Sequence, residues 1–186
     1  MFETVRNAFK IKDLRNKLFY TFFALIVVRI GSQLPVPGVK YEAIREMFNS
    51  QKSLDFFNQL TGGSFEQMSI FALNITPYIT ASIIIQLLTI AIPRLEELHK
   101  DGEEGRKKLT EYTRYVTIGL SVLESAAMAI GFGNSGYLTD DKITFTSVSV
   151  IIVSLTAGSA FLMWLGEQIT EKGVGNGISI VLAVNI

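Results

Sequence analysis

The chain has 186 residues, of which 48% are hydrophobic and 18% are charged, and its formal net charge at pH 7 is zero. This balance gives no overall positive field of the kind that favours nucleic-acid binding. The absence of cysteine excludes disulfides and thiol chemistry, and the single histidine, His99, lacks the partners that a histidine metal site or a catalytic triad needs.

Four apolar segments approach the roughly 20 residues that a membrane-spanning helix needs. The first follows a basic leader at 1–17; because its apolar core is long and no small-residue cleavage pattern follows, we expect a retained span. A fifth apolar run, 178–186, would give about 14 Å of helix, too short to cross a bilayer, so we expect the natural protein to be longer. The predicted fold class is all-α, a polytopic membrane helical bundle with spans at about 18–34, 75–92, 116–132 and 143–165.

The distribution of Lys and Arg predicts the orientation of these spans. If the spans alternate, one side carries twelve basic residues, from the leader, the segment 93–114 and Lys172, and the other side carries four. The excess of positive charge on cytoplasmic loops therefore places the amino terminus in the cytoplasm. Arg29 lies inside the first span, where we expect it to reach the outer interface or to pair with a lipid or an acidic group.

A short helix is predicted at about 64–73, before the second span. It follows the flexible pair Gly62 and Gly63, and its first residues, SFEQ, fit a capping box. Asn74 and a Thr-Pro pair then interrupt the helix, with Thr76 suited to an N-cap and the proline to the first helical position. Either this is one membrane pass broken beside a protein-lined cavity, or it is an external helix leading into an ordinary span; the residues favour neither.

Four stretches are similar to one known family and occur in its order. By these stretches the chain resembles the amino-terminal half of the SecY family, which implies spans one to four and the start of the fifth in a channel of ten spans, built from two inverted halves. The stretches are RIGSQLPVPGV at 29–39, FALNITPYITASIIIQLL at 71–88, EEGRKKLTEYTRY at 103–115 and, most specifically, FLMWLGEQITEKGVGNGISI at 161–180.

The resemblance also implies roles for individual residues. The pore constriction would include Ile75, Ile79, Ile178 and Leu182, the last replacing the family's usual isoleucine. The plug that closes the external funnel, with its hinge, would include Gly62, Gly63, Ser64, Phe65 and Phe71. One wall of the lateral gate would carry Thr80, Ile83, Gln86 and Leu87, and the cytoplasmic loop contacts would be Arg106, Lys107 and Lys108.

The implied function is that of the central subunit of a protein-conducting channel in the bacterial cytoplasmic membrane. It would pass unfolded secretory polypeptides across the bilayer and membrane spans sideways into it. Implied partners are membrane lipid, the SecE and SecG subunits, the translocating polypeptide, and the SecA motor or the ribosome, which would dock mainly on the other half. No cofactor, metal, enzymatic activity or direct nucleic-acid contact is expected.

Other functions fit the residues less well. A small-solute secondary transporter also uses broken helices, but it predicts an ionisable residue at the break, where this chain has Asn74 and Thr76. An intramembrane protease needs a catalytic set within the spans, and Glu124 stands alone there. Glu167 and Glu171 are four residues apart, and we interpret them as a solvent-facing helix end rather than an acid–base pair.

Overall fold

The computed structural model describes residues 11–50, 63–139 and 144–185. Within these residues strand pairing is limited to two isolated bridges, Pro35 with Ser69 and Val39 with Leu138, so the predicted all-α class is confirmed. The helices are α2 (Lys12–Gly31), α3 (Tyr41–Ser50), α5 (Thr76–Ala91), α6 (Pro93–Lys100), α7 (Gly102–Asn134), α8 (Phe145–Lys172) and α9 (Gly177–Asn185).

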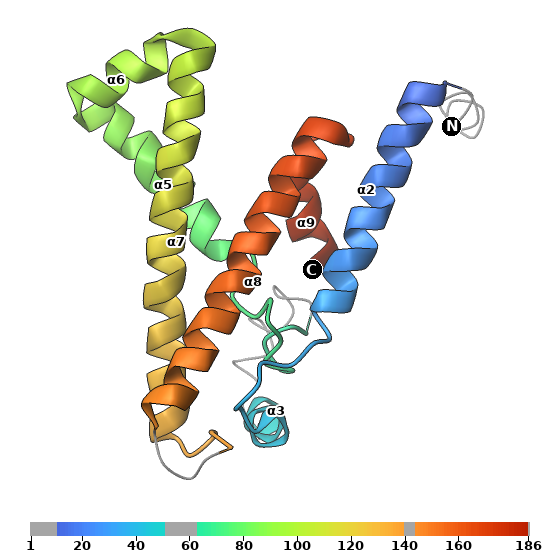
Figure 1. Ribbon diagram of the computed structural model, residues 1–186, viewed down its shortest axis with the longest axis vertical. Coiled ribbons are helices and arrows are strands. Elements are labelled where there is room, and N and C mark those ends of the chain that lie inside the picture. The colour runs from blue at the N-terminus through green and yellow to red at the C-terminus, as the bar shows by residue number, and fades with distance from the viewer. Residues whose placement is uncertain (1–10, 51–62, 140–143, 186) are drawn as a thin grey trace.

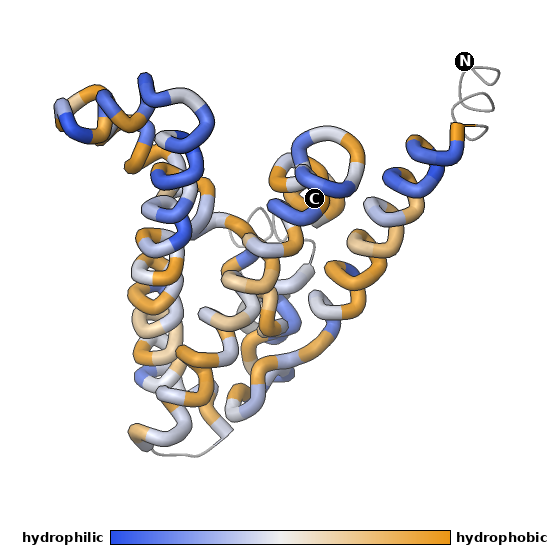
Figure 2. Tube along the Cα trace, turned by 45° about the horizontal axis from the view of Figure 1, so that its top comes forward, coloured by the Kyte–Doolittle hydropathy of each residue, from blue (hydrophilic) through white to orange (hydrophobic). Residues whose placement is uncertain are grey.

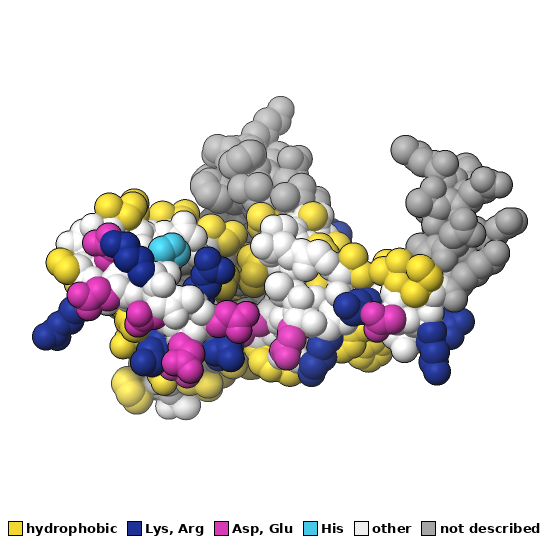
Figure 3. Space-filling view, turned by 90° about the horizontal axis from the view of Figure 1, so that it is seen from above, with side chains coloured by type: hydrophobic (Ala, Val, Ile, Leu, Met, Phe, Trp, Pro, Cys, Tyr) yellow, Lys and Arg dark blue, Asp and Glu magenta, His cyan; other side chains and the backbone are white. Residues whose placement is uncertain are grey.

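The long helix α8 lies at the centre of the arrangement. It contacts α7 on one side and α2 and α9 on the other, while α5 and α6 pack against α7 (Figure 1). The start of α2, the α6–α7 turn and the carboxyl end of α8 share the upper end of Figure 1, and α3 lies at the lower end. Figure 2 shows hydrophilic residues gathered at that upper end, and Figure 3 shows Lys, Arg, Asp and Glu mixed across it. The described parts of the predicted basic segments therefore lie at one end of the molecule.

Two helices are long and apolar enough to cross a membrane by length and composition, namely α7 and α8. The pair α5 and α6, bent by 103°, would count as a third. Helix α2 does not qualify, because every 18-residue stretch within it includes at least three charged side chains. Its charges lie in its first turns and at Arg29 in its last turn.

Helix α7 packs through a stripe of small and hydroxyl-bearing residues spaced four apart. All four hydroxyls in the stripe donate to carbonyls of the same helix; Thr113, for example, donates to the Leu109 carbonyl at 2.9 Å and Thr117 to the Thr113 carbonyl at 2.7 Å. Small residues let helices in a membrane approach closely. The buried members of the stripe are Thr113, Thr117, Ser121, Ser125 and Ala129.

The segment 63–75 departs from the predicted short helix. It forms consecutive turns, and Met68 and Asn74 have φ of 44° and 52°, in the left-handed region that an α-helix cannot accommodate. The backbone instead bonds to the chain that follows α2: the Val36 amide donates to the Met68 carbonyl at 2.8 Å, and the Ile70 amide donates to the Leu34 carbonyl at 2.9 Å. These long-range bonds replace the local helical ones.

The predicted interruption before the second span is present. Helix α5 begins at Thr76 with Pro77 in its first turn, and Ile75 rather than Thr76 occupies the N-cap position. Gly62, most of the leader 1–17 and Ile186 lie outside the described residues.

Candidate functional site

Four apolar side chains from the start of α5 and from α9 belong to or pack against one apolar cluster beside α8. Ile75, at the start of α5, is fully buried, and Ile79, Ile178 and Leu182 pack half-buried against the same apolar cluster. Gly166 of α8 makes this meeting possible. A Cβ atom added there would lie 2.6 Å from Cδ1 of Ile178 and 3.5 Å from Cδ1 of Ile75. The structure thus brings together the four residues expected at the constriction.

A tight turn between α8 and α9 positions Ile178 and Leu182. The Gly177 amide donates to Oγ1 of Thr170 at 2.8 Å, and a side chain at Gly177 would clash with the Gly166 carbonyl. The Ser179 amide donates to Oδ1 of Asn176 at 3.2 Å, which satisfies one amide in the first turn of α9. Helix α9 can therefore return closely along α8.

Phe71 anchors the segment 63–75 between α2 and α8. It is 4% exposed, and its ring stacks on Phe161 with centroids 5.9 Å apart and planes 7° apart. A side chain at Gly31 would clash with this ring, and a side chain at Gly158 would clash with the carbonyl of Ile70. Two glycines thus form the slot that receives the ring. Of the other residues expected in the plug, Ser64 is buried and Phe65 is half-buried.

The expected gate residues lie along α5. Ile83 and Leu87 are 51% and 61% exposed, so the described residues leave more than half of each uncovered. Gln86 is also exposed, and its Nε2 donates to Oγ of Ser82 at 3.4 Å; Thr80 is half-buried. The expected loop contacts Arg106, Lys107 and Lys108 are exposed in the first turns of α7, just after the turn from α6.

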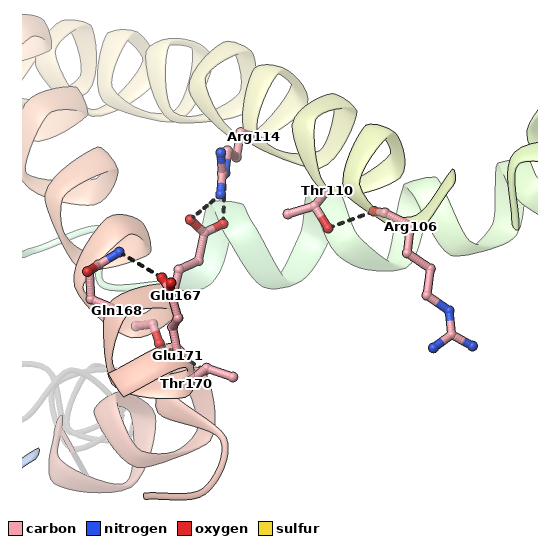
Figure 4. A network of polar contacts seen from close by, with 8 residues as sticks. Arg106, Thr110, Arg114, Glu167, Gln168, Thr170 and Glu171 are labelled. Atoms are coloured by element: carbon pink, nitrogen blue, oxygen red, sulfur yellow. Dashed lines mark hydrogen bonds and ion pairs between the residues drawn. The ribbon is translucent and has the colours of Figure 1, made fainter. Parts of the chain in front are cut away.

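A bidentate ion pair joins α7 to α8 near the charged end (Figure 4). Nε of Arg114 lies 3.0 Å from Oε1 of Glu167, and Nη2 lies 2.8 Å from Oε2. The Glu167 side chain is 19% exposed, so its interpretation as a solvent-facing residue is wrong. Because 53 residues separate the partners, no local pattern predicts the pair. In the described part of the chain no group of three His, Cys, Asp or Glu side chains is placed to hold a metal ion.

Comparison with known proteins identifies the family. The SecY family model matches residues 69–186. The protein translocase subunit SecY of Bacillus subtilis is 48% identical over 189 residues, covering 100% of this chain and 43% of its own length. The corresponding subunit of Streptomyces coelicolor is 42% identical over 199 residues, covering 100% of this chain and 45% of its own length. The chain belongs to the SecY family. It spans less than half the length of these relatives.

Solved channels share the fold of this SecY-family chain. Sec61 in the canine ribosome–channel complex from the endoplasmic reticulum matches with a TM-score of 0.62 and 21% identity, over 92% of this chain and 36% of that chain. A second structure matches with a TM-score of 0.61 and 23% identity, over 91% of this chain and 35% of that chain. It is a structure of a SecY protein whose plug domain stabilises the closed state of the translocation channel and maintains a membrane seal. These likenesses confirm the fold.

The region matched by the SecY family model includes most of the candidate site. All four constriction residues, Phe71, the gate residues and the basic loop fall within 69–186. The described residues at the start of the expected plug, Gly63 to Phe65, precede it.

Proposed function

We propose that this chain forms part of the central subunit of a protein-conducting channel, which passes unfolded secretory polypeptides across the bacterial cytoplasmic membrane. The observation that supports this most is the meeting of Ile75 and Ile178 at Gly166, with Ile79 and Leu182 beside them. Flexible apolar side chains can surround a chain of any sequence without binding it firmly. They also offer ions no ligands, and a narrow apolar passage resists wetting.

We infer that the segment 63–75 acts as the plug of this channel. A plug has to be held in the resting state and still be able to leave. The segment is irregular rather than helical. Its attachments include the buried Phe71 ring, the side chains of Met68, Ala72 and Leu73 in the apolar core, and backbone hydrogen bonds to the chain that follows α2. A short irregular segment between helices can move as a unit without unfolding the helices that flank it.

We further infer that α5 and α7 form one wall of a lateral gate. Exposed Ile83 and Leu87 make that face of α5 compatible with lipid or with the apolar side of a passing membrane span. Gln86, on the same helix, supplies a hydrogen-bonding group at an otherwise apolar seam. In the complete protein of ten spans, the second wall would come from the other inverted half.

We also propose an orientation, based on the charged end of the molecule, and partners, based on the family. The excess of Lys and Arg indicates that the end formed by the start of α2, the α6–α7 turn and the end of α8 faces the cytoplasm. Because α2 starts at this end, the amino terminus is cytoplasmic. SecE and SecG would pack against the helices, and SecA or the ribosome would engage the cytoplasmic side. One of the similar structures is Sec61 in a complex of ribosome and channel. The proposed role is that of a conduit, with no catalytic step.

The solute-transporter alternative gains no support. The relatives and structures described above are named as translocase subunits or channels. At the break, the described residues are Asn74, Ile75 and Thr76, which provide no ionisable side chain to couple an ion to a solute.

Reconstitution tests the proposal. Proteoliposomes containing the complete protein with its partner subunits and motor should protect a precursor bearing a signal sequence from external protease. The same precursor with a disabled signal sequence is the matched control and should be digested. Equal digestion of both precursors, with correctly inserted and folded protein, would refute the proposed function.

A further inference from the structure

An ion pair attaches the segment 63–75 to a helix at the end of the molecule opposite the charged end. Nε of Arg45, on α3, lies 3.1 Å from Oε1 of Glu66. The two residues are 21 apart in sequence and belong to separate parts of the fold, so their contact exists only while the segment lies against α3. They line one wall of a depression of about 280 Å³, together with Gln33, Tyr41 and Gln67.

The burial of the two partners is unequal. The Arg45 side chain is 68% exposed, whereas the Glu66 side chain is 23% exposed. A carboxylate that is mostly covered has lost part of its hydration, and an adjacent guanidinium offsets that loss. Removing or reversing the charge of Arg45 would leave Glu66 partly desolvated, while displacement of the segment would return its carboxylate to water. Loss of the pair therefore favours the displaced state.

The ion pair is positioned to complement the other attachments of the segment. Phe71 and the backbone hydrogen bonds from Val36 and to Leu34 hold residues 68–71. Glu66 precedes this part of the segment and is bound to a different helix. The side chains of Met68, Ala72 and Leu73 also lie in the apolar core. The ion pair therefore adds an attachment near the start of the segment, away from the buried part, and restricts the motion of that end.

We propose that Arg45 and Glu66 are positioning residues that hold the segment 63–75 against α3 in the resting channel, and that their ion pair sets how readily the segment moves aside. This inference rests on the proposed function, since it assigns a control to the same plug. An exposed ion pair of this kind changes an equilibrium constant by about two- to five-fold. The pair therefore adjusts the threshold for opening and does not by itself close the channel.

The test measures ion leak through the complete channel complex in planar bilayers without a precursor. Glu66→Arg should raise the resting leak about two- to five-fold, because it replaces attraction to Arg45 by repulsion. Glu46→Arg is the matched control: it makes the same change of charge at an exposed residue of α3 that has no ion pair among the described residues. The exchange Arg45→Glu with Glu66→Arg should return the leak toward that of the parent.

Equal leak in Glu66→Arg and Glu46→Arg would overturn the inference, as would an exchange variant that leaks as much as Glu66→Arg. A general loss of structure would raise the leak in the exchange variant too, so the rescue separates positioning from misfolding. Import of a signal-bearing precursor by the parent is measured on the same preparation. If the parent imports the precursor and the leak is unchanged, the ion-pair inference fails alone. If the parent imports nothing, the proposed function fails and the inference falls with it.

Discussion

Replacing Phe71 by Ala should release the segment 63–75 from its slot. The ring is 4% exposed, lies where Gly31 and Gly158 have no side chain, and stacks on Phe161. Ala removes the ring and leaves an empty slot between α2 and α8. The segment then keeps its backbone hydrogen bonds to Leu34 and Val36 and its core side chains Met68 and Leu73, but it loses the stacked ring.

The magnitude follows from these contacts. Burying a phenylalanine side chain is worth about 1.5–3 kcal/mol, and a well-placed aromatic pair adds about 0.5–1.5 kcal/mol. Their sum, about 2–4.5 kcal/mol, corresponds to a change of roughly 30- to 2,000-fold in the ratio of displaced to docked segment. Phe71→Leu retains most of the apolar volume and loses the stacking, so it should change the ratio by less than about 10-fold.

Thiol labelling measures this ratio. The chain contains no cysteine, so Ala72→Cys introduces a single thiol at a residue that is 2% exposed. In a complete protein without other cysteines, labelling by a polar maleimide requires the segment to open. When the segment closes again faster than the reagent reacts, the labelling rate is proportional to the displaced population. The rate should therefore rise at least about 30-fold in Phe71→Ala.

A labelling rate in Phe71→Ala equal to that of the parent would refute this account of the anchor. Phe22→Ala is the control, because Phe22 on α2 is 65% exposed and its loss should leave the rate unchanged. A rise of similar size in Phe22→Ala would show that labelling reports general loosening instead of release of the ring.

Other predictions follow from the same contacts. Gly158→Ala should lower the thermal unfolding temperature and speed labelling at position 72, because its Cβ would clash with the Ile70 carbonyl. Gly119→Ala is the control: no atom lies within 4 Å of the added Cβ, so labelling should be unchanged and the unfolding temperature unchanged or slightly raised. Equal effects of the two substitutions would contradict the close packing at Gly158. A double-mutant cycle of Arg114→Gln and Glu167→Gln, measured by unfolding free energies, should give a coupling free energy of about 0.5–1 kcal/mol, because the pair is bidentate but Arg114 is half-exposed. A coupling near zero would mean that the pair does not hold α7 to α8. Gly166→Val should weaken the contact of Ile178 with Ile75 by inserting methyl groups between them and raise the resting ion leak, and an unchanged leak would argue against that contact as a seal.

Local patterns in the sequence predicted the cores of three helices and the start of one of them. Long apolar runs marked the cores of α5, α7 and α8, and Pro77 marked the start of α5, because proline fits the first turn of a helix. The capping-box pattern at SFEQ led to a wrong helix. There, two backbone hydrogen bonds to Leu34 and Val36, more than thirty residues away, outweigh the local preference.

The side-chain pairs that attach one element to another were not predictable in this way. Arg114 and Glu167 lie 53 residues apart, and Arg45 and Glu66 lie 21 apart, so neither pair follows a helical or strand spacing. The constriction residues came from resemblance to a family. The physical reason for their meeting, the missing side chain at Gly166, becomes evident only once α5, α8 and α9 are placed together.

The central claim, a polypeptide path lined by Ile75 and Ile79, is tested most directly by photo-crosslinking in the complete protein in membranes. A photoreactive residue at position 79 should form a covalent adduct with a secretory precursor stalled in transit, and the adduct should disappear when the signal sequence is disabled. The same photoreactive residue in place of Val153, a residue of α8 that is 66% exposed, should give no such adduct. Export of the precursor without any adduct at 79 or 178 would contradict the proposed pore.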